Sequence, residues 1–113
     1  MSCLTLAVTE TIDESIQVND YGTTNARDCT GEQVLVRLTT GEGRLVKEWD
    51  ADVGYDDDGR GLAWDSQAAG TARWIPQAGY TAHVGTLYRT WWHVTALGKR
   101  FPITPQERVV VAP

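Results

Sequence analysis

Short runs that alternate apolar and polar residues are the feature that most limits the fold of this chain. The clearest run, EQVLVRLT at 32–39, sets Val34, Val36 and Leu38 on one face, as in a half-buried strand. No window holds the i, i+3, i+4, i+7 apolar spacing of a helix, and turn signals recur about every eight to twelve residues. This pattern predicts an all-β fold, an antiparallel β-sandwich of about seven or eight strands.

The expected strands follow one another along the whole chain. They lie at 4–8, 12–18, 32–39, 44–49, 70–76, 86–95, 100–103 and 108–112. Gly41-Glu-Gly43 has the length of a hairpin connection between the third and fourth of these runs. The acidic, Gly-containing segment 50–61 is expected to be a long surface loop, with at most a short strand at 51–55.

The length and charge of the chain restrict its class. With 113 residues it suits a single domain, 1–113, that folds without metal or disulfide support. A net charge of −5 and the lack of a basic run argue against nucleic acid, because phosphate binding needs clustered Lys and Arg. No apolar stretch approaches a membrane span, and the N-terminus lacks the charged and apolar regions of a signal peptide. We therefore expect no nucleic-acid or membrane partner, and a protein that stays in a cytoplasm or leaves it inside a larger particle.

The two cysteines give little support for a zinc or redox site. Cys3 and Cys29 lie far apart, and neither belongs to a C-x-x-C pair. Two free thiols are the default expectation. A disulfide between them stays open, because it requires that their strands be neighbours.

The acidic segment 50–61 invites comparison with calcium loops, because hard cations bind several carboxylate oxygens. Counted from Asp56 as an EF-hand loop, the sixth position is Gly61, which fits. The fifth position, which should hold a ligand, is Arg60, and the twelfth is Gln67 where a bidentate Glu is needed. We expect a solvated acidic loop, no metal site and no cofactor.

Catalytic patterns are weak. His83 and His93 are the two histidines, and Asp65-Ser66 has no G-x-S-x-G elbow around it. The glycine clusters lack the following Lys-Ser/Thr and helix of a phosphate loop. A Ser-His-Asp site can be assembled from scattered residues, but we expect no catalytic residues and no enzyme.

Two adjacent tryptophans mark the strand expected at 86–95. Alternation divides this strand into one face with Tyr88, Thr90, Trp92 and Val94 and another with Leu87, Arg89, Trp91 and His93. We expect Trp92 to face the core, which leaves Trp91 beside Leu87 on the outer face. An apolar outer face is typical of a protein contact surface. Leu87 and Trp91, together with an exposed ring expected at Trp49, are therefore the predicted partner-binding residues.

Five Trp in 113 residues also suit a carbohydrate-binding module, because small β-sandwiches can stack sugars on exposed rings. In this alternative the stacking residues are Trp49, Trp91 and Tyr80. Against it, Trp64, Trp74 and Trp92 are expected in the core or at its corners, which leaves few exposed rings.

Several short motifs occur in a fixed order along the chain. Asp28-Cys-Thr-Gly31 leads into the run EQVLVRL, and GTARWIP follows at 70–76. The run VGTLYRTWWHVT at 84–95 is followed by a Leu-Gly turn, by RFP and by a closing VVV. This order resembles tailed-phage virion structural proteins with an immunoglobulin-like sandwich, similar to the N-terminal domain of the phage baseplate upper protein. The chain departs from that pattern at Cys29, where Leu is usual, and by one extra residue between Gly85 and Tyr88.

The resemblance implies an immunoglobulin-like sandwich and a non-enzymatic role in a phage particle. It gives no catalytic residues to carry over and does not give a position in the particle. We expect a head decoration or a neck or collar component that binds major capsid or connector proteins, with a baseplate or fibre-anchoring protein of the tail as the alternative. We also expect a homo-oligomeric or multi-copy protein of the virion, assembled in the host cytoplasm. Edge strands at 4–8 or 109–111 are candidates for completion by a neighbour's strand.

Overall fold

The computed structural model describes residues 3–7, 12–20, 22–77, 85–103 and 107–112, with the backbone alone at 3–7, 85–86 and 107–112. Its strands are β1 (Cys3–Ala7), β2 (Glu14–Gln17), β3 (Gln33–Thr40), β4 (Leu45–Asp50), β5 (Gly54–Tyr55), β6 (Gly61–Ser66), β7 (Thr71–Ile75), β8 (Gly85–Val94), β9 (Arg100–Pro102) and β10 (Glu107–Ala112). A single 3-10 turn, η1 (Gln67–Ala69), joins β6 to β7 in the described part of the chain.

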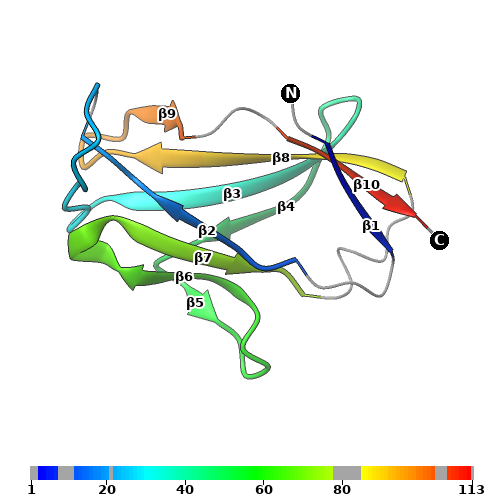
Figure 1. Ribbon diagram of the computed structural model, residues 1–113, viewed down its shortest axis with the longest axis horizontal. Helices are drawn as coiled ribbons and strands as arrows, with labels where there is room; N and C mark the ends of the chain where they lie inside the picture. The colour runs from blue at the N-terminus through cyan, green and yellow to red at the C-terminus, as the bar shows by residue number, and fades with distance from the viewer. Residues whose placement is uncertain (1–2, 8–11, 21, 78–84, 104–106, 113) are drawn as a thin grey trace.

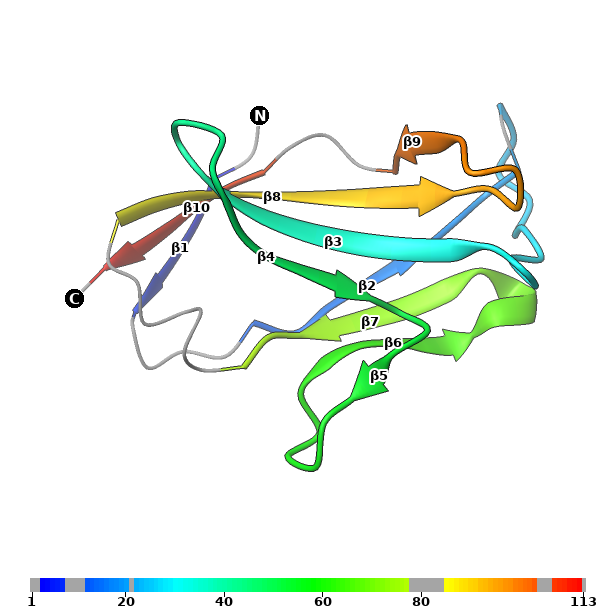
Figure 2. The same ribbon diagram turned by 180° about the vertical axis from the view of Figure 1, so that it is seen from behind.

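The strands form two layers. A six-stranded sheet has the order β1-β10-β8-β3-β4, with β9 also paired to β8, and a four-stranded sheet has the order β2-β7-β6-β5. Figures 1 and 2 show β8, β3 and β4 on one side of the molecule and β7, β6 and β5 on the other. The predicted all-β sandwich is confirmed, and β5 and β6, which are not among the eight expected strands, raise the number of strands above eight. The finer expectation of an immunoglobulin-like sandwich stays a prediction.

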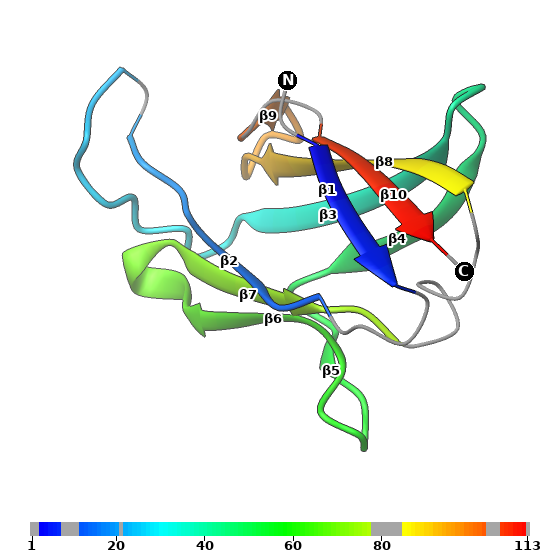
Figure 3. The ribbon, with the colours of Figure 1, turned by 45° about the vertical axis from the view of Figure 1, so that its right-hand side comes forward.

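The first and last strands lie side by side, as Figure 3 shows. β1 pairs with β10 in parallel, whereas every other strand pairing in the described residues is antiparallel. β10 therefore lies between β1 and β8, and the expectation that 109–111 is an edge is wrong. Residues 4–7 of the run expected at 4–8 lie in β1, which is an edge strand of the described sheet.

The core fills the space between the two sheets. From the six-stranded sheet it takes Val34 and Val36, which are fully buried, and from the four-stranded sheet Leu62 and Trp74. Trp74 meets Trp49 in an edge-to-face contact with ring centroids 5.3 Å apart. Such aromatic pairs add about 0.5–1.5 kcal/mol to the burial of the rings.

The two faces of β8 are the reverse of those expected. Trp91 is 0% exposed and belongs to the core, whereas Trp92 is only partly buried. In the register of β3 with β8, Trp91 lies opposite Val36, so both side chains point into the sandwich. Trp92 lies opposite Leu35 on the outer face. The expectation failed because Arg89 and His93 share the face of Trp91, and two chargeable residues made that face look solvated.

None of the described residues belongs to a helix with the length and apolar character that crossing a membrane requires.

Candidate functional site

A turn at residues 28–32 positions two of the three side chains that cluster in the candidate site. Asp28 Oδ1 accepts hydrogen bonds from the amide of Thr30 at 3.0 Å and from its hydroxyl at 2.6 Å. The amide of Glu32 donates to the carbonyl of Cys29 at 2.8 Å, which closes a four-residue turn. Gly31 at its third position has a φ of 79°, which glycine adopts without strain. The Asp-Cys-Thr-Gly motif is therefore a turn that directs the side chains of Cys29 and Glu32 inward.

Gln67 of η1 holds this turn against the other sheet. Its carbonyl accepts from the amide of Cys29 at 2.9 Å. Its side-chain Nε2 donates to the carbonyls of Cys29 at 3.1 Å and of Glu32 at 3.3 Å. These hydrogen bonds satisfy buried backbone groups, so they fix the position of the turn without the help of a ligand.

The carboxylate of Glu32 is buried, with only 6% of the residue exposed. Arg27 donates to both of its oxygens, from Nε to Oε1 at 2.7 Å and from Nη2 to Oε2 at 2.8 Å. This bidentate pair, assisted by His93, holds the pKa of Glu32 at about 2, below its usual value of 4.5 and against the effect of burial. The carboxylate is therefore ionised at neutral pH.

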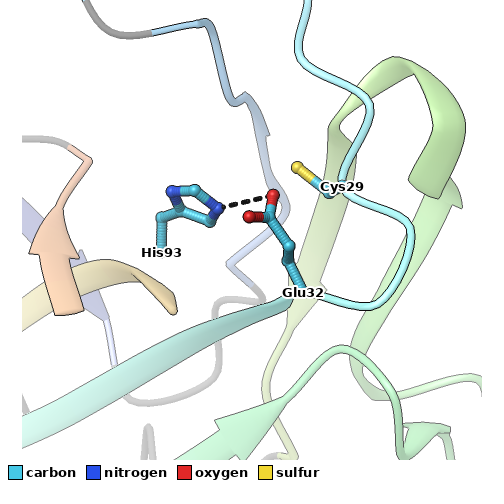
Figure 4. A group of neighbouring side chains, drawn as sticks. All are labelled: Cys29, Glu32 and His93. Carbon is cyan, nitrogen blue, oxygen red and sulfur yellow. Dashed lines mark hydrogen bonds and ion pairs between the residues drawn. The ribbon is translucent and has the colours of Figure 1, made fainter. Parts of the chain in front are cut away.

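His93 reaches the same carboxylate from β8. Its Nε2 lies 3.0 Å from Glu32 Oε1, and the two residues are 61 positions apart in the chain. Figure 4 shows the imidazole and the Cys29 sulfur on either side of the Glu32 carboxylate. One ligand atom from each of Cys29, Glu32 and His93 lies within 4.8 Å of the other two. Burial and the charge of Glu32 raise the pKa of the Cys29 thiol from 9.0 to about 11, so it is protonated at neutral pH.

A cavity of about 330 Å³ opens next to this cluster. His93 and Arg27 form part of its wall, with Asp20 from the loop after β2 and Phe101 from β9. Asp20 Oδ1 lies 3.3 Å from Arg27 Nη1, so Arg27 bridges the two carboxylates. The volume is near the lower end of the range of small-molecule sites. In the described part of the chain, sulfur, nitrogen and oxygen ligand atoms thus lie together beside a cavity whose wall includes His93.

The predicted partner-binding residues lie elsewhere and are buried. Leu87 is 7% exposed, Trp49 is 6% exposed and Trp91 is fully buried. The structure does bring two of them together, since Trp49 and Trp91 flank Val36 on the inner face of the sheet. The expectation that the three present an exposed apolar face is wrong, because that face is the core side of the six-stranded sheet.

The residues named for sugar stacking have no free ring face in the described structure. Trp49 and Trp91 are in the core, and their indole nitrogens donate to Gln77 and Glu14 respectively. Tyr80 and His83 lie outside the described residues.

The acidic segment uses its carboxylates to hold turns. Asp56 Oδ1 accepts from the amides of Asp58 at 2.9 Å and Arg60 at 3.0 Å, and Asp50 Oδ1 accepts from the amide of Asp52 at 2.9 Å. Asp57 and Asp58 are exposed. In the part of the chain that the structure describes, the ligand atoms that converge are those of Cys29, Glu32 and His93 and not those of this segment.

The sequence does not reveal the cluster, because Cys29 and Glu32 share one turn whereas His93 comes from β8, 61 positions after Glu32. Their spacing matches no local metal-binding motif. One signal was available: His93 shares a strand face with the large apolar residues Leu87 and Trp91. A histidine on such a face is expected to be buried and to need a hydrogen-bond partner.

Comparisons with known proteins place the fold in context. No protein-family model matches the chain, and no curated protein sequence matches it. The crystal structure of CopC from Methylosinus trichosporium OB3b has 10% identity and a TM-score of 0.56, and the match covers 100% of this chain and 86% of that one. The N-terminal domain of ORF48 from phage TP901-1 has 13% identity and a TM-score of 0.55, with 99% and 86% covered. What these chains share is the fold.

Proposed function

We propose that this chain is a non-enzymatic structural protein of a tailed-phage particle. The observation that carries the proposal is the likeness to the phage ORF48 domain, which extends over 99% of this chain. CopC shares the fold equally well, so the fold alone does not separate the two. The ordered motifs from Asp28 to the closing Val-Val-Val favour the phage assignment, because they resemble phage virion proteins along the same length.

The proposed position is the particle exterior, as a head decoration or a neck or collar component, with a baseplate or fibre-anchoring position as the alternative. The proposed partners are major capsid, connector or tail proteins, and the chain would be present in several copies. Exposed carboxylates such as Asp57 and Asp58 would then face solvent, where they pay no desolvation cost.

Because the predicted contact face is buried, the partner has to meet another surface. We propose the tip of the β8–β9 hairpin, residues 96–101. Leu97 is 89% exposed and Phe101 is 44% exposed, and both lie beside the exposed cations Lys99 and Arg100. The turn is preformed, since the amide of Gly98 donates to the carbonyl of Thr95 at 2.9 Å. A basic, apolar tip on a protein of net charge −5 suits an acidic partner surface.

Val53 is a weaker candidate although it is 82% exposed. Its near neighbours in the sequence include Asp50, Asp52 and Asp56, so burying Val53 against a partner would desolvate their carboxylates. This makes Val53 a matched control for an exposed apolar residue outside the proposed contact.

The test is mass spectrometry of purified particles of the phage or prophage whose genome carries this gene. The proposal expects the protein in the particles at several copies each, and finding it only free in the lysate would contradict a structural role. Labelling by an antibody in electron micrographs separates head or neck from baseplate. A purified protein that binds glycans but not particles would favour the carbohydrate-binding alternative.

The contact surface is tested by complementing a deletion of the gene. The variant Leu97→Ser with Phe101→Ser should lose incorporation by about tenfold or more. Because Phe101 is partly buried, the midpoint of thermal unfolding should fall slightly, but the variant should remain folded. Val53→Ser should incorporate normally. If all variants incorporate equally, the β8–β9 tip is not the contact surface.

A further inference from the structure

The side chains of Cys29, Glu32 and His93 form a ligand set that the proposed virion role does not use. They offer a sulfur, a carboxylate oxygen and an imidazole nitrogen, all within 4.8 Å of one another. Ligand atoms around a tetrahedral Zn²⁺ lie roughly 3.5 Å apart, given metal–ligand distances of about 2.0–2.3 Å. Shifts of about 1 Å in side-chain position would therefore bring all three to bonding distance of one ion. Glu32 and His93 are already 3.0 Å apart.

The ligand types narrow the choice of ion. Thiolate and imidazole together favour a borderline cation such as Zn²⁺ over the hard cations Mg²⁺ and Ca²⁺, which prefer oxygen ligands. Three protein ligands with a fourth position open to solvent is a common zinc arrangement. His93 lines the cavity of about 330 Å³, so an ion and water would reach the cluster from the side of its imidazole.

The surroundings also fit a cation. Arg27 donates to both oxygens of Glu32, but each carboxylate oxygen has two lone pairs, so Glu32 can bind an ion while Arg27 holds its orientation. Asp20 lies 3.3 Å from Arg27 and adds a second carboxylate to the local charge. Two carboxylates face one guanidinium here, and this excess of negative charge favours a cation in the cluster.

We propose that Cys29, Glu32 and His93 bind Zn²⁺ or a similar borderline divalent cation, with the fourth position open to the neighbouring cavity. Binding replaces the proton of the Cys29 thiol, which is released to solvent. Arg27 is the positioning residue for the carboxylate. The proposal is independent of the virion role, because it depends on the monomer alone.

The experiment uses the full chain, purified and freed of metal with a chelator, and titrated with Co²⁺ as a spectroscopic probe. Coordination through Cys29 should produce an intense near-ultraviolet thiolate-to-cobalt absorption that equimolar Zn²⁺ removes. Zn²⁺ alone should raise the midpoint of thermal unfolding. Absence of the absorption in the wild-type protein would overturn the proposal.

Matched variants identify the ligands. Cys3→Ser should keep the cobalt absorption, whereas Cys29→Ser should abolish it. His93→Gln and Glu32→Gln should each weaken Zn²⁺ binding by about tenfold or more. An absorption that survives in Cys29→Ser but disappears in Cys3→Ser would place the metal elsewhere and contradict the assignment.

A second measurement avoids variants of the cluster, which could fail to fold. In the folded Cys3→Ser protein, iodoacetamide reaches the buried Cys29 thiol through transient opening of the structure. Zn²⁺ should slow this alkylation, as followed by mass spectrometry, by about tenfold or more. Mg²⁺ at the same concentration should have no effect. Equal alkylation rates with and without Zn²⁺ would rule out coordination by Cys29.

Discussion

Arg89 Nη2 lies 2.7 Å from Glu14 Oε2, although the two residues are 75 positions apart in the chain. Arg89 is on the inner face of β8 and Glu14 is on β2 of the opposite sheet, so this ion pair crosses the sandwich. Glu14 also accepts a hydrogen bond from the indole nitrogen of Trp91. A buried charge is tolerated when it is paired. The carboxylate of Glu14 therefore allows the face of β8 that carries Arg89 to point into the core.

Replacing Glu14 by Gln should destabilise the protein by about 3 kcal/mol, because it removes a carboxylate that lies 2.7 Å from the buried charge of Arg89. Gln retains an acceptor for Trp91, which isolates the effect of the charge. Chemical denaturation measures the loss. The double variant Glu14→Gln with Arg89→Met should recover most of it, and a double variant as unstable as Glu14→Gln would show that the charge is not the cause.

Trp91→Ala should cost about 3–5 kcal/mol in the free energy of unfolding, because it empties a fully buried site in the core. Trp92→Ala is the neighbouring control, and its partly buried ring on the outer face should cost about 1–2 kcal/mol. Urea denaturation of both variants tests the orientation of β8. A larger loss for Trp92→Ala would mean that the faces are reversed.

Gly70→Ala should be among the most damaging glycine substitutions. A Cβ there would lie 2.6 Å from the carbonyl oxygen of Arg27 and 2.8 Å from that of Val18, at a φ of +70°. The control Gly59→Ala has a similar φ of +74° with nothing within 4 Å of the new Cβ, so it should lose only about 1–2 kcal/mol from backbone strain. Thermal unfolding of the two variants should show the larger loss for Gly70→Ala, and equal losses would argue against the close approach.

Asp56 should make stability depend on pH in the acid range. Backbone amides, first that of Arg60, and the side chain of Gln77 lower the pKa of Asp56 below its usual 3.8. The folded state therefore favours the ionised form, and this contribution is present above the usual pKa and is lost as the pH falls through the lowered one. As the pH falls from about 5 through the usual pKa of Asp56 and below it, the variant Asp56→Asn should lose less stability than the wild type. Parallel losses in the two proteins would contradict a role for the charge of Asp56.

Much of the fold follows from local patterns. The alternation of Val34, Val36 and Leu38 identified the central strand β3 and its buried face, and the glycines at 41 and 43 identified the hairpin to β4. The Asp-Cys-Thr-Gly motif is visible in the sequence, and the structure shows that it forms a turn. These features depend on side-chain alternation and turn chemistry, which act over a few residues and are readable in one dimension.

The candidate site could not be predicted in the same way. His93 meets Glu32 from 61 positions away, and the contact exists because β8 pairs with β3 in a register that puts His93 opposite Val34. A shift of that register by one residue would send every side chain of β8 to the other face.

The sequence by itself therefore determined that the chain is a β-sandwich, where its main turns and hairpin lie, and which face of β3 is buried. Only the tertiary structure decided which face of β8 is buried, because that choice depends on carboxylates supplied from elsewhere. Glu14 neutralises Arg89 and Glu32 receives His93, and with both partners in place Trp91 can enter the core. Whether a polar side chain can be buried depends on the groups that lie near it in the folded protein, and the sequence of a single strand does not contain that information.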